Sequence, residues 1–399
     1  MEMITVQQAE NIILSQIQNF GEEYVSYEKA LGRILAEHLI ADRGLPPFDR
    51  PTVDGIAIKY EAYERGTSSF RIKAVQAAGE PSVSIDSDGE CVEIMTGAAL
   101  DHSVDTVIRY EDISIENGIA KLTIHIKKGQ NIHLKARDKK QGEILVKTNQ
   151  VISPAVIGIA ASIGKTSLLV KKLPKVLIIS TGDEMVSPES VPSPFQLRRS
   201  NGITIQSVLK KYGIQADNLH LNDDYNEIKK ELSRCIIEYD ILLMSGGVSM
   251  GKFDYLPKVC EELGIKKLFH KIKQRPGKPF WFGKNSDHKL VFAFPGNPVS
   301  VFMCLHRYFI PWLEQSMGIE SSQQYAVLQN DIDFPFTLQY FAQVKLQVNQ
   351  QGHLTAESVN TNGSGDFSHL ADTDAFIELP LEQNTFKKGE VFKIWKYNL

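Results

Sequence analysis

The sequence predicts a multidomain α/β protein. Three short apolar runs, "KVLIIS", "DILLMS" and "KLVFAF", are each followed by a loop containing Gly or Pro and then by a helical pattern. Such runs are typical of buried parallel strands joined by crossover helices. Alternating β-type patterns before and after this region predict two further β-rich parts. A chain of 399 residues also exceeds one ordinary core, so two to four domains are expected.

Helical patterns flank the first β-rich part. Apolar residues at helical spacing predict a helix within residues 5–19. The stretch "SYEKALGRILAEHLIA" predicts a second helix, with Ser26 as its N-cap. "SPAVIGIAASIG" predicts a third, capped by Ser153 and ended by Gly164. Helices that resume after a β insertion indicate a discontinuous N-terminal domain.

The two β-rich parts consist of short alternating runs separated by turn residues. The first contains "FRIKAVQA", "DTVIRYEDISI" and "IAKLTIHIK", and the second "YAVLQNDIDF", "YFAQVKLQV", "HLTAESV" and "AFIELP". The expected domains are a discontinuous N-terminal domain (1–45 and 142–173), an inserted β-rich domain (46–141), an α/β domain (174–320) and a C-terminal β domain (321–399).

Composition excludes several classes of protein. The net charge of -4 argues against a general nucleic-acid binder, and no apolar run approaches the length of a membrane span. The four cysteines are scattered, so buried free thiols are expected and not a disulfide framework or zinc site. The acidic, amphipathic N-terminus differs from a signal peptide, which predicts a cytoplasmic location.

The first strand-end loop is "STGDEM". The carboxyl ends of parallel strands form the usual ligand cleft of such sheets, so the loops after the three apolar runs should meet there. Asp183 and Glu184 place two carboxylates at the end of the first strand. They suit a magnesium ion, whose ligands are hard oxygens, but they also suit a helix N-terminus. The loop alone leaves both interpretations open.

The second loop, "SGGVSMGKFDY", resembles the first seven positions of a P-loop. Phe253 stands where the magnesium-binding Ser or Thr belongs, so we do not predict a P-loop. Instead, the backbone N–H groups of Gly246, Gly247 and Ser249 are expected to form an anion nest, with Asp254 as a nearby carboxylate.

Two further loops contribute to this cleft. In "AFPGNPVS", Asn297 and Pro298 are typical of a helix start, and the exposed N–H groups would face the cleft. In "QRPGKPFWFG", Arg275 and Lys278 flank a tight turn and would suit a polyanionic ligand.

Taken together, these segments resemble the MoeA family of molybdopterin molybdotransferases, which are related to the E domain of gephyrin. The resemblance rests on the order "PPFDRPTVDGIAI", "IMTGAALDHSVDTVIRYED", "STGDE", "SNGITIQSVLKKYG", "SGGVSMGKFDY", "RPGKPFWFG", "FPGNPVSVF" and "GSGDFSHLADTDAFIELP", and it covers nearly the whole chain.

The resemblance implies a molybdopterin-binding-like three-layer α/β domain and a C-terminal β-barrel-like domain. It also implies a homodimer with clefts shared between subunits, and a molybdopterin adenylyltransferase as upstream partner. The implied reaction inserts molybdate into adenylated molybdopterin with release of AMP, and it uses Mg²⁺.

The resemblance also implies roles for individual residues. The implied catalytic residues are Asp54, Thr96, Asp138, Glu184 and Asp254. The implied substrate-binding residues are Gly246, Gly247, Ser249, Arg275, Lys278, Pro295, Asn297 and Pro298. The implied metal ligands are Glu184, Asp223, Asp224 and Asp254.

The sequence departs from the family pattern at Ala136 and Arg137, where the family has Gly-Glu, and around Gln343, where it has two arginines. These departures support one alternative, a degenerate pterin-binding or scaffold protein without turnover. A P-loop-like NTPase is a second alternative and predicts hydrolysis that depends on Lys252. A third, an amidohydrolase of the competence-damage type, leaves the matches before residue 140 and after residue 330 unexplained.

Overall fold

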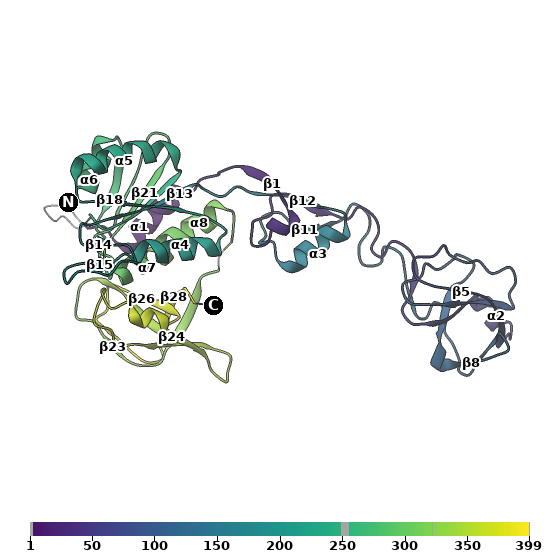
Figure 1. Cartoon of the computed structure of the whole chain (residues 1–399). Helices are drawn as coiled ribbons and strands as arrows, with labels where there is room; N and C mark the ends of the chain where they lie inside the picture. Colours follow the sequence, from purple (N-terminus) through teal and green to yellow (C-terminus); the bar gives the residue numbers. More distant parts are fainter. Residues whose placement is uncertain (1–2, 249–254, 321, 399) are drawn as a thin grey trace.

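The computed structural model describes residues 3–248, 255–320 and 322–398, which form an elongated molecule (Figure 1). A central α/β body and a C-terminal β barrel lie side by side at one end, joined by pairing of a strand from each. A small segment, built from residues 22–40 and 144–171, lies next along the molecule. A distal β domain forms the opposite end. This arrangement confirms the predicted multidomain α/β architecture.

The central body is built on a mixed sheet, whose described strands follow the order β16-β13-β17-β21-β20-β18. The first four strands are parallel, and β20 is antiparallel to both of its neighbours. The three apolar runs are β13, β17 and β21, which are adjacent, so the loops after them meet at one edge of the sheet. The strands are β13 (Val176–Thr181), β16 (Asp217–Leu221), β17 (Ile241–Ser245), β18 (Lys266–His270), β20 (Trp281–Lys284) and β21 (Leu290–Phe294).

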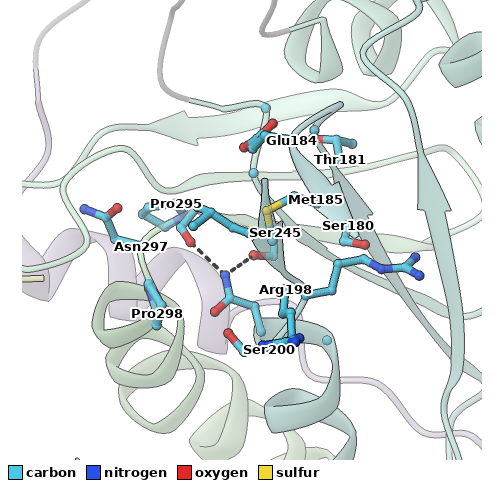
Figure 2. Close-up of a pocket in the computed structure, with 18 of the residues that line it drawn as sticks. Ser180, Thr181, Glu184, Met185, Arg198, Ser200, Ser245, Pro295, Asn297 and Pro298 are labelled. Carbon is cyan, nitrogen blue, oxygen red and sulfur yellow. Dashed lines mark hydrogen bonds between the residues drawn. The ribbon is translucent and has the colours of Figure 1, made fainter. Parts of the chain in front are cut away.

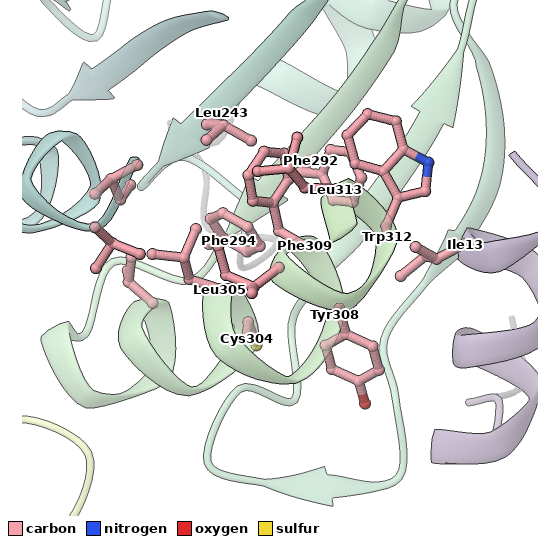
Figure 3. Close-up of a cluster of buried hydrophobic side chains, with 14 of the residues drawn as sticks. Ile13, Leu243, Phe292, Phe294, Cys304, Leu305, Tyr308, Phe309, Trp312 and Leu313 are labelled. Atoms are coloured by element: carbon pink, nitrogen blue, oxygen red, sulfur yellow. The ribbon is translucent and has the colours of Figure 1, made fainter. Parts of the chain in front are cut away.

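Helices cover both faces of this sheet and complete three layers. Helices α1, α4, α7 and α8 pack on one face, and α5 and α6 on the other. Figure 3 shows the aromatic centre of the first face, where the Phe292 ring lies 5.2 Å from that of Phe309 and 5.5 Å from that of Trp312. The helices are α1 (Val6–Leu14), α4 (Asn201–Lys211), α5 (Tyr225–Glu238), α6 (Leu256–Glu262), α7 (Pro298–Cys304), the π-helix η3 (Leu305–Phe309) and α8 (Ile310–Ser316).

The first helix shares its core with the central body. It begins after Thr5, which caps it through a reciprocal capping box, and it buries Ile13 in the aromatic cluster. Arg307 of η3 is 1% exposed and forms ion pairs with Glu10 of α1 and Glu378 of the barrel. These buried ion pairs hold α1, η3 and the barrel together, because separating the partners would leave a buried charge unpaired.

In the small segment, the prediction of a second α-helix over the stretch that begins at Ser26 is wrong. Residues 26–41 contain short strands, turns and the short 3-10 helix η1, which Ser26 caps, and Leu35 forms a bridge with Val170. Gly32 adopts a φ of 77°, which interrupts a helix, and pairing with distant residues outweighs the local helical pattern. The helix predicted to follow Ser153 is confirmed. The elements are β1 (Glu22–Ser26), η1 (Tyr27–Lys29), β2 (Leu39–Ile40), β11 (Ile144–Val146), α3 (Pro154–Ser162) and β12 (Ser167–Lys171).

The distal domain contains the predicted β insertion. Its described main sheet follows the order β7-β4-β6-β5-β9-β8, and β3 pairs with β10 where the chain enters and leaves. The elements are β3 (Arg50–Pro51), β4 (Gly55–Ile58), α2 (Tyr60–Glu64), β5 (Ser69–Gln76), β6 (Glu90–Ile94), β7 (Thr106–Arg109), η2 (Tyr110–Asp112), β8 (Ile113–Glu116), β9 (Ile119–Leu122) and β10 (Ile132–His133).

The C-terminal domain is a closed barrel, since β24 pairs with both β25 and β26 around the order β24-β25-β22-β28-β26. Strand β19 (Gln274–Arg275) of the central body pairs with β24 from outside. The domain contains β22 (Gln324–Leu328), β23 (Ile332–Asp333), β24 (Gln339–Val348), β25 (Leu354–Ser358), β26 (Ala375–Leu379), β27 (Thr385–Phe386) and β28 (Val391–Lys396), with the short helix η4 (Ser368–Ala371). Two short strands of the central body, β14 (Met185–Val186) and β15 (Leu197–Arg198), pair with each other.

Two expectations from composition concern the whole chain. All four cysteines lie in the described ranges as buried free thiols, as predicted. Among the described helices, none combines the length and apolar character that crossing a membrane requires.

Candidate active site

A cavity of about 910 Å³ opens at the carboxyl ends of the parallel strands. Its walls come from the loops after β13, β17 and β21, from the start of α4 and from the loop before η4 (Figure 2). Among the residues predicted for the site, it brings together Glu184, Asp223, Gly246, Gly247, Pro295, Asn297 and Pro298. Because these residues come from four separate stretches of the chain, only the sheet topology places them together.

The β17 loop carries the paired glycines. Gly246 and Gly247 have φ angles of 98° and 67°, which L-residues rarely adopt. A Cβ at either position would approach Thr181 Oγ1 to 3.1 or 3.0 Å, so the loop lies directly against the end of β13. Thr181 Oγ1 is buried and finds no hydrogen-bond partner within the described ranges. Ser249 and Asp254, like Lys252 and Phe253, lie outside the described residues.

The β13 loop places Glu184 at the cavity. Its carboxylate folds back over Gly182, where a Cβ would lie 2.7 Å from Oε2, so a side chain at position 182 would displace it. Asp223 also lines the cavity, and its backbone N–H donates to Asp183 Oδ1 over 3.0 Å. Asp224 has another role in the structure: its carboxylate accepts from Glu227 N over 2.8 Å and caps α5.

The β21 loop is held by the neighbouring barrel. Asn297 precedes α7, as expected for an N-cap, but its side-chain nitrogen donates to Ser364 Oγ over 2.7 Å, and no described helical N–H bonds to its side chain. Pro298 is the first residue of α7. The loop therefore connects the cavity with the C-terminal domain.

The residues that precede and begin α4 were not among those predicted for the site. Arg198, Arg199 and Asn201 line the cavity, and Arg198 Nε donates to Ser190 O over 3.1 Å. The signal was present in "LRRSNG", a pair of arginines directly before a predicted helix. Cations there suit an anionic ligand.

A second missed feature is a serine–histidine pair. Ser180 Oγ lies 3.0 Å from His220 Nδ1, across the ends of β13 and β16, and Ser180 faces the cavity. Burial, aided by the nearby Arg199, lowers the pKa of His220 from its ordinary value. No sequence pattern indicated this pair, because the two residues are brought together by strand register.

Arg275 and Lys278 lie in the turn between the central body and the barrel. Arg275 lines a second cavity of about 230 Å³, with its guanidinium 5.0 Å from the centre of the Phe336 ring. Lys278 is exposed, and its carbonyl accepts from Ile272 N. Pro279 of the same turn lines the strand-end cavity. The basic turn therefore lies at the edge of the site.

The remaining predicted residues lie in or next to the distal domain, at the opposite end of the molecule (Figure 1). Asp54 and Thr96 are in direct contact: Thr96 N and Oγ1 each donate to Asp54 Oδ1 over 2.6 Å. Both hydrogen bonds lower the pKa of the Asp54 carboxyl, and the bond from the Thr96 hydroxyl has the larger effect. Asp138 is exposed and lies 2.9 Å from His133 Nε2.

The donors at the strand-end cavity fit Mg²⁺ in kind. Glu184 and Asp223 offer the carboxylate oxygens that Mg²⁺ prefers, and this ion is usually bound by one or two carboxylates together with substrate phosphates. Within the described ranges, no group of three or more His, Cys, Asp or Glu is arranged as a self-sufficient metal centre. The cavity therefore suits an ion that is bound together with a phosphate ligand.

Known protein families match this chain over nearly its whole length. Residues 4–164 match the MoeA N-terminal region (domains I and II), residues 177–315 a probable molybdopterin binding domain, and residues 325–397 the MoeA C-terminal region (domain IV). The molybdopterin molybdenumtransferase of Synechocystis is 39% identical over 399 residues, covering 99% of this chain and all of the relative.

The chain belongs to the MoeA family. The molybdopterin molybdenumtransferase of Staphylococcus epidermidis is 29% identical over 98% of this chain and 95% of its own length. The crystal structure of the molybdopterin biosynthesis MoeA protein from Pyrococcus horikoshii superposes with a TM-score of 0.85 at 28% identity, covering 99% of each chain. The chain therefore resembles these relatives in both sequence and domain architecture.

Proposed function

We propose that this protein is a molybdopterin molybdenumtransferase, which inserts molybdate into adenylated molybdopterin and releases AMP. One observation carries the proposal: a strand-end cavity combines the Gly246–Gly247 loop with arginines and carboxylates, in a chain 39% identical to a molybdopterin molybdenumtransferase. A cavity of about 910 Å³ is large enough for a nucleotide-sized ligand.

The proposed reaction breaks the phosphoanhydride bond between the pterin phosphate and AMP. Positioning and charge neutralisation provide most of the catalysis in such reactions. The N–H group of Gly247 would bind a phosphate oxygen, and Arg198 and Arg199 would neutralise the charge of the phosphates. Glu184 and Asp223 would hold Mg²⁺. Bound Mg²⁺ would further neutralise the phosphate oxygens.

We further propose that the protein acts as a homodimer. Asp54 and Thr96 lie at the opposite end of the subunit from the cavity, so a second copy is needed to bring such residues to it. The small segment supports association, because Tyr24, Ile40 and Val151 are 68%, 48% and 50% exposed. Burying such side chains in a dimer interface would be favourable. The dimer would complete two cavities.

The remaining parts of the proposal concern the cellular setting. The substrate must be made by an adenylating enzyme, so a molybdopterin adenylyltransferase is the proposed upstream partner. A cytoplasmic location belongs to the same proposal. The net charge of -4 gives no reason to propose nucleic acid as a partner.

One assay tests the proposed function. Purified protein with adenylated molybdopterin, Mg²⁺ and molybdate should release AMP and yield active cofactor. Tight binding of the substrate without AMP release would contradict the proposal and favour a pterin-binding scaffold. Mixing Asp54→Ala protein with Glu184→Ala protein tests the shared cavity: mixed dimers should regain part of the activity that each variant lacks. If the mixture remains inactive, the proposal that two subunits share each cavity is wrong.

A further inference from the structure

The side-chain amide of Asn201 bridges two loops of the cavity. Asn201 is the first residue of α4, and its Nδ2 donates to Ser245 Oγ over 2.8 Å and to Gly296 O over 2.7 Å (Figure 2). Ser245 ends β17, and Gly296 lies in the loop after β21. Both amide protons are therefore used, one for each loop.

The two loops approach each other closely at this point. A Cβ on Gly296 would lie 3.8 Å from the Gly246 Cα, and Gly246 N donates to Phe294 O over 3.3 Å. Ser245 is only 5% exposed, so its hydroxyl depends on a protein partner. The Asn201 amide supplies that partner and fixes the Gly296 carbonyl at the same time.

We infer that Asn201 is a positioning residue, which sets the spacing between the Gly246–Gly247 loop and the Pro295–Pro298 loop. With this spacing fixed, the two loops can bind the phosphates of one substrate in the geometry of the reaction. The inference rests on the proposed function. A displacement of about 1 Å can lower a rate roughly 100-fold, so a bridge of this kind affects turnover more than stability.

Asn201→Asp provides the sharpest test, because it preserves the shape of the side chain but removes both donors. In the full-length protein, kcat for AMP release is expected to fall about 100-fold, with a smaller change in KM and a melting temperature close to that of the wild type. Asn201→Ala should behave similarly. The matched control is Asn330→Asp, which removes a 2.7 Å amide–serine hydrogen bond to Ser358 in the barrel and should retain wild-type kcat.

Two outcomes would overturn the inference: an Asn201→Asp protein with wild-type kcat and KM, or an Asn330→Asp protein with an equal loss of kcat. A wild-type protein that releases no AMP would instead contradict the proposed function. In that case, the affinity for adenylated molybdopterin still tests the bridge. A loss of affinity in Asn201→Asp that Asn330→Asp does not share would support it, and equal affinity in the two variants would refute it.

Discussion

Thr96 donates both its backbone N–H and its hydroxyl to one oxygen of Asp54, and each hydrogen bond is 2.6 Å long. These bonds lower the pKa of Asp54 because they stabilise the carboxylate. The carboxylate therefore remains ionised at a lower pH than an ordinary aspartate.

The first prediction concerns the pH dependence of turnover. Thr96→Val removes the hydroxyl donor and so raises the pKa of Asp54 toward its ordinary value. If the ionised Asp54 takes part in the reaction, the acidic limb of the kcat/KM profile should move to higher pH. Thr96→Ser retains the hydroxyl and should keep the wild-type profile. Superimposable profiles for the valine variant and the wild type would exclude this role.

The second prediction separates two of the carboxylates that the family resemblance implies as metal ligands, Glu184 and Asp224. Glu184→Gln should raise the Mg²⁺ concentration needed for half-maximal AMP release, because Glu184 faces the cavity. Asp224→Ala should instead lower stability by about 1 kcal/mol, because it removes the N-cap of α5, and leave the Mg²⁺ requirement unchanged. Asp224→Ser should recover most of the stability. A changed Mg²⁺ requirement in Asp224→Ser would restore that residue as a metal-ligand candidate.

The third prediction concerns the paired glycines. Gly247→Ala would force an L-residue to a φ of 67° and place its Cβ 3.0 Å from Thr181 Oγ1 and Leu256 Cδ1. Substrate affinity should fall about tenfold or more, since the loop must shift. Gly264→Ala is the control, because Gly264 has a φ of 76° but no described neighbouring atom within 4 Å of the place that a methyl group would take. It should lose about 1 kcal/mol of stability and retain substrate affinity. Equal affinities in the two variants would contradict the proposed anion nest.

The fourth prediction concerns Ala136, one of the departures from the family pattern. Ala136 adopts a φ of 58°, a conformation that favours glycine. Ala136→Gly should therefore stabilise the protein by about 1 kcal/mol in urea unfolding. Ala155→Gly, in the exposed face of α3, should destabilise it by a similar amount. Destabilisation by both substitutions would show that the backbone at position 136 carries no strain.

The fifth prediction concerns stability at acidic pH. Burial lowers the pKa of His306 from 6.5 to about 4, so the unfolded state binds a proton before the folded state does. Stability should therefore fall by about 2 kcal/mol between pH 7 and pH 5 from this residue. The raised pKa of Glu314, caused by burial, acts in the opposite direction and reduces the net slope.

Urea unfolding of His306→Gln at both pH values isolates this contribution. The variant should show a weaker loss of stability at pH 5 than the wild type does. His102→Gln is the control, because the His102 side chain is 95% exposed, and it should retain the wild-type pH dependence. If His306→Gln and the wild type lose equal stability, His306 is not the titrating group.

Elements with strong local patterns were predictable from the sequence. The apolar runs of β13, β17 and β21 and the capped start of α3 were predicted correctly, since burial of apolar runs and capping depend on adjacent residues. The order of the loops also identified the family. Local pattern failed for residues 26–41, where strand pairing with residues far along the chain decided the conformation.

Which residues share a site depends on how the whole chain folds. It brought Arg198, Arg199 and Asn201 to the same cavity as the glycine loop, and it placed Ser180 beside His220. It also assigned Asp224 to a helix cap and put Asp54 at the far end of the subunit. Residue types and spacing specify chemistry along the chain, whereas strand register and domain packing determine which side chains come within bonding distance.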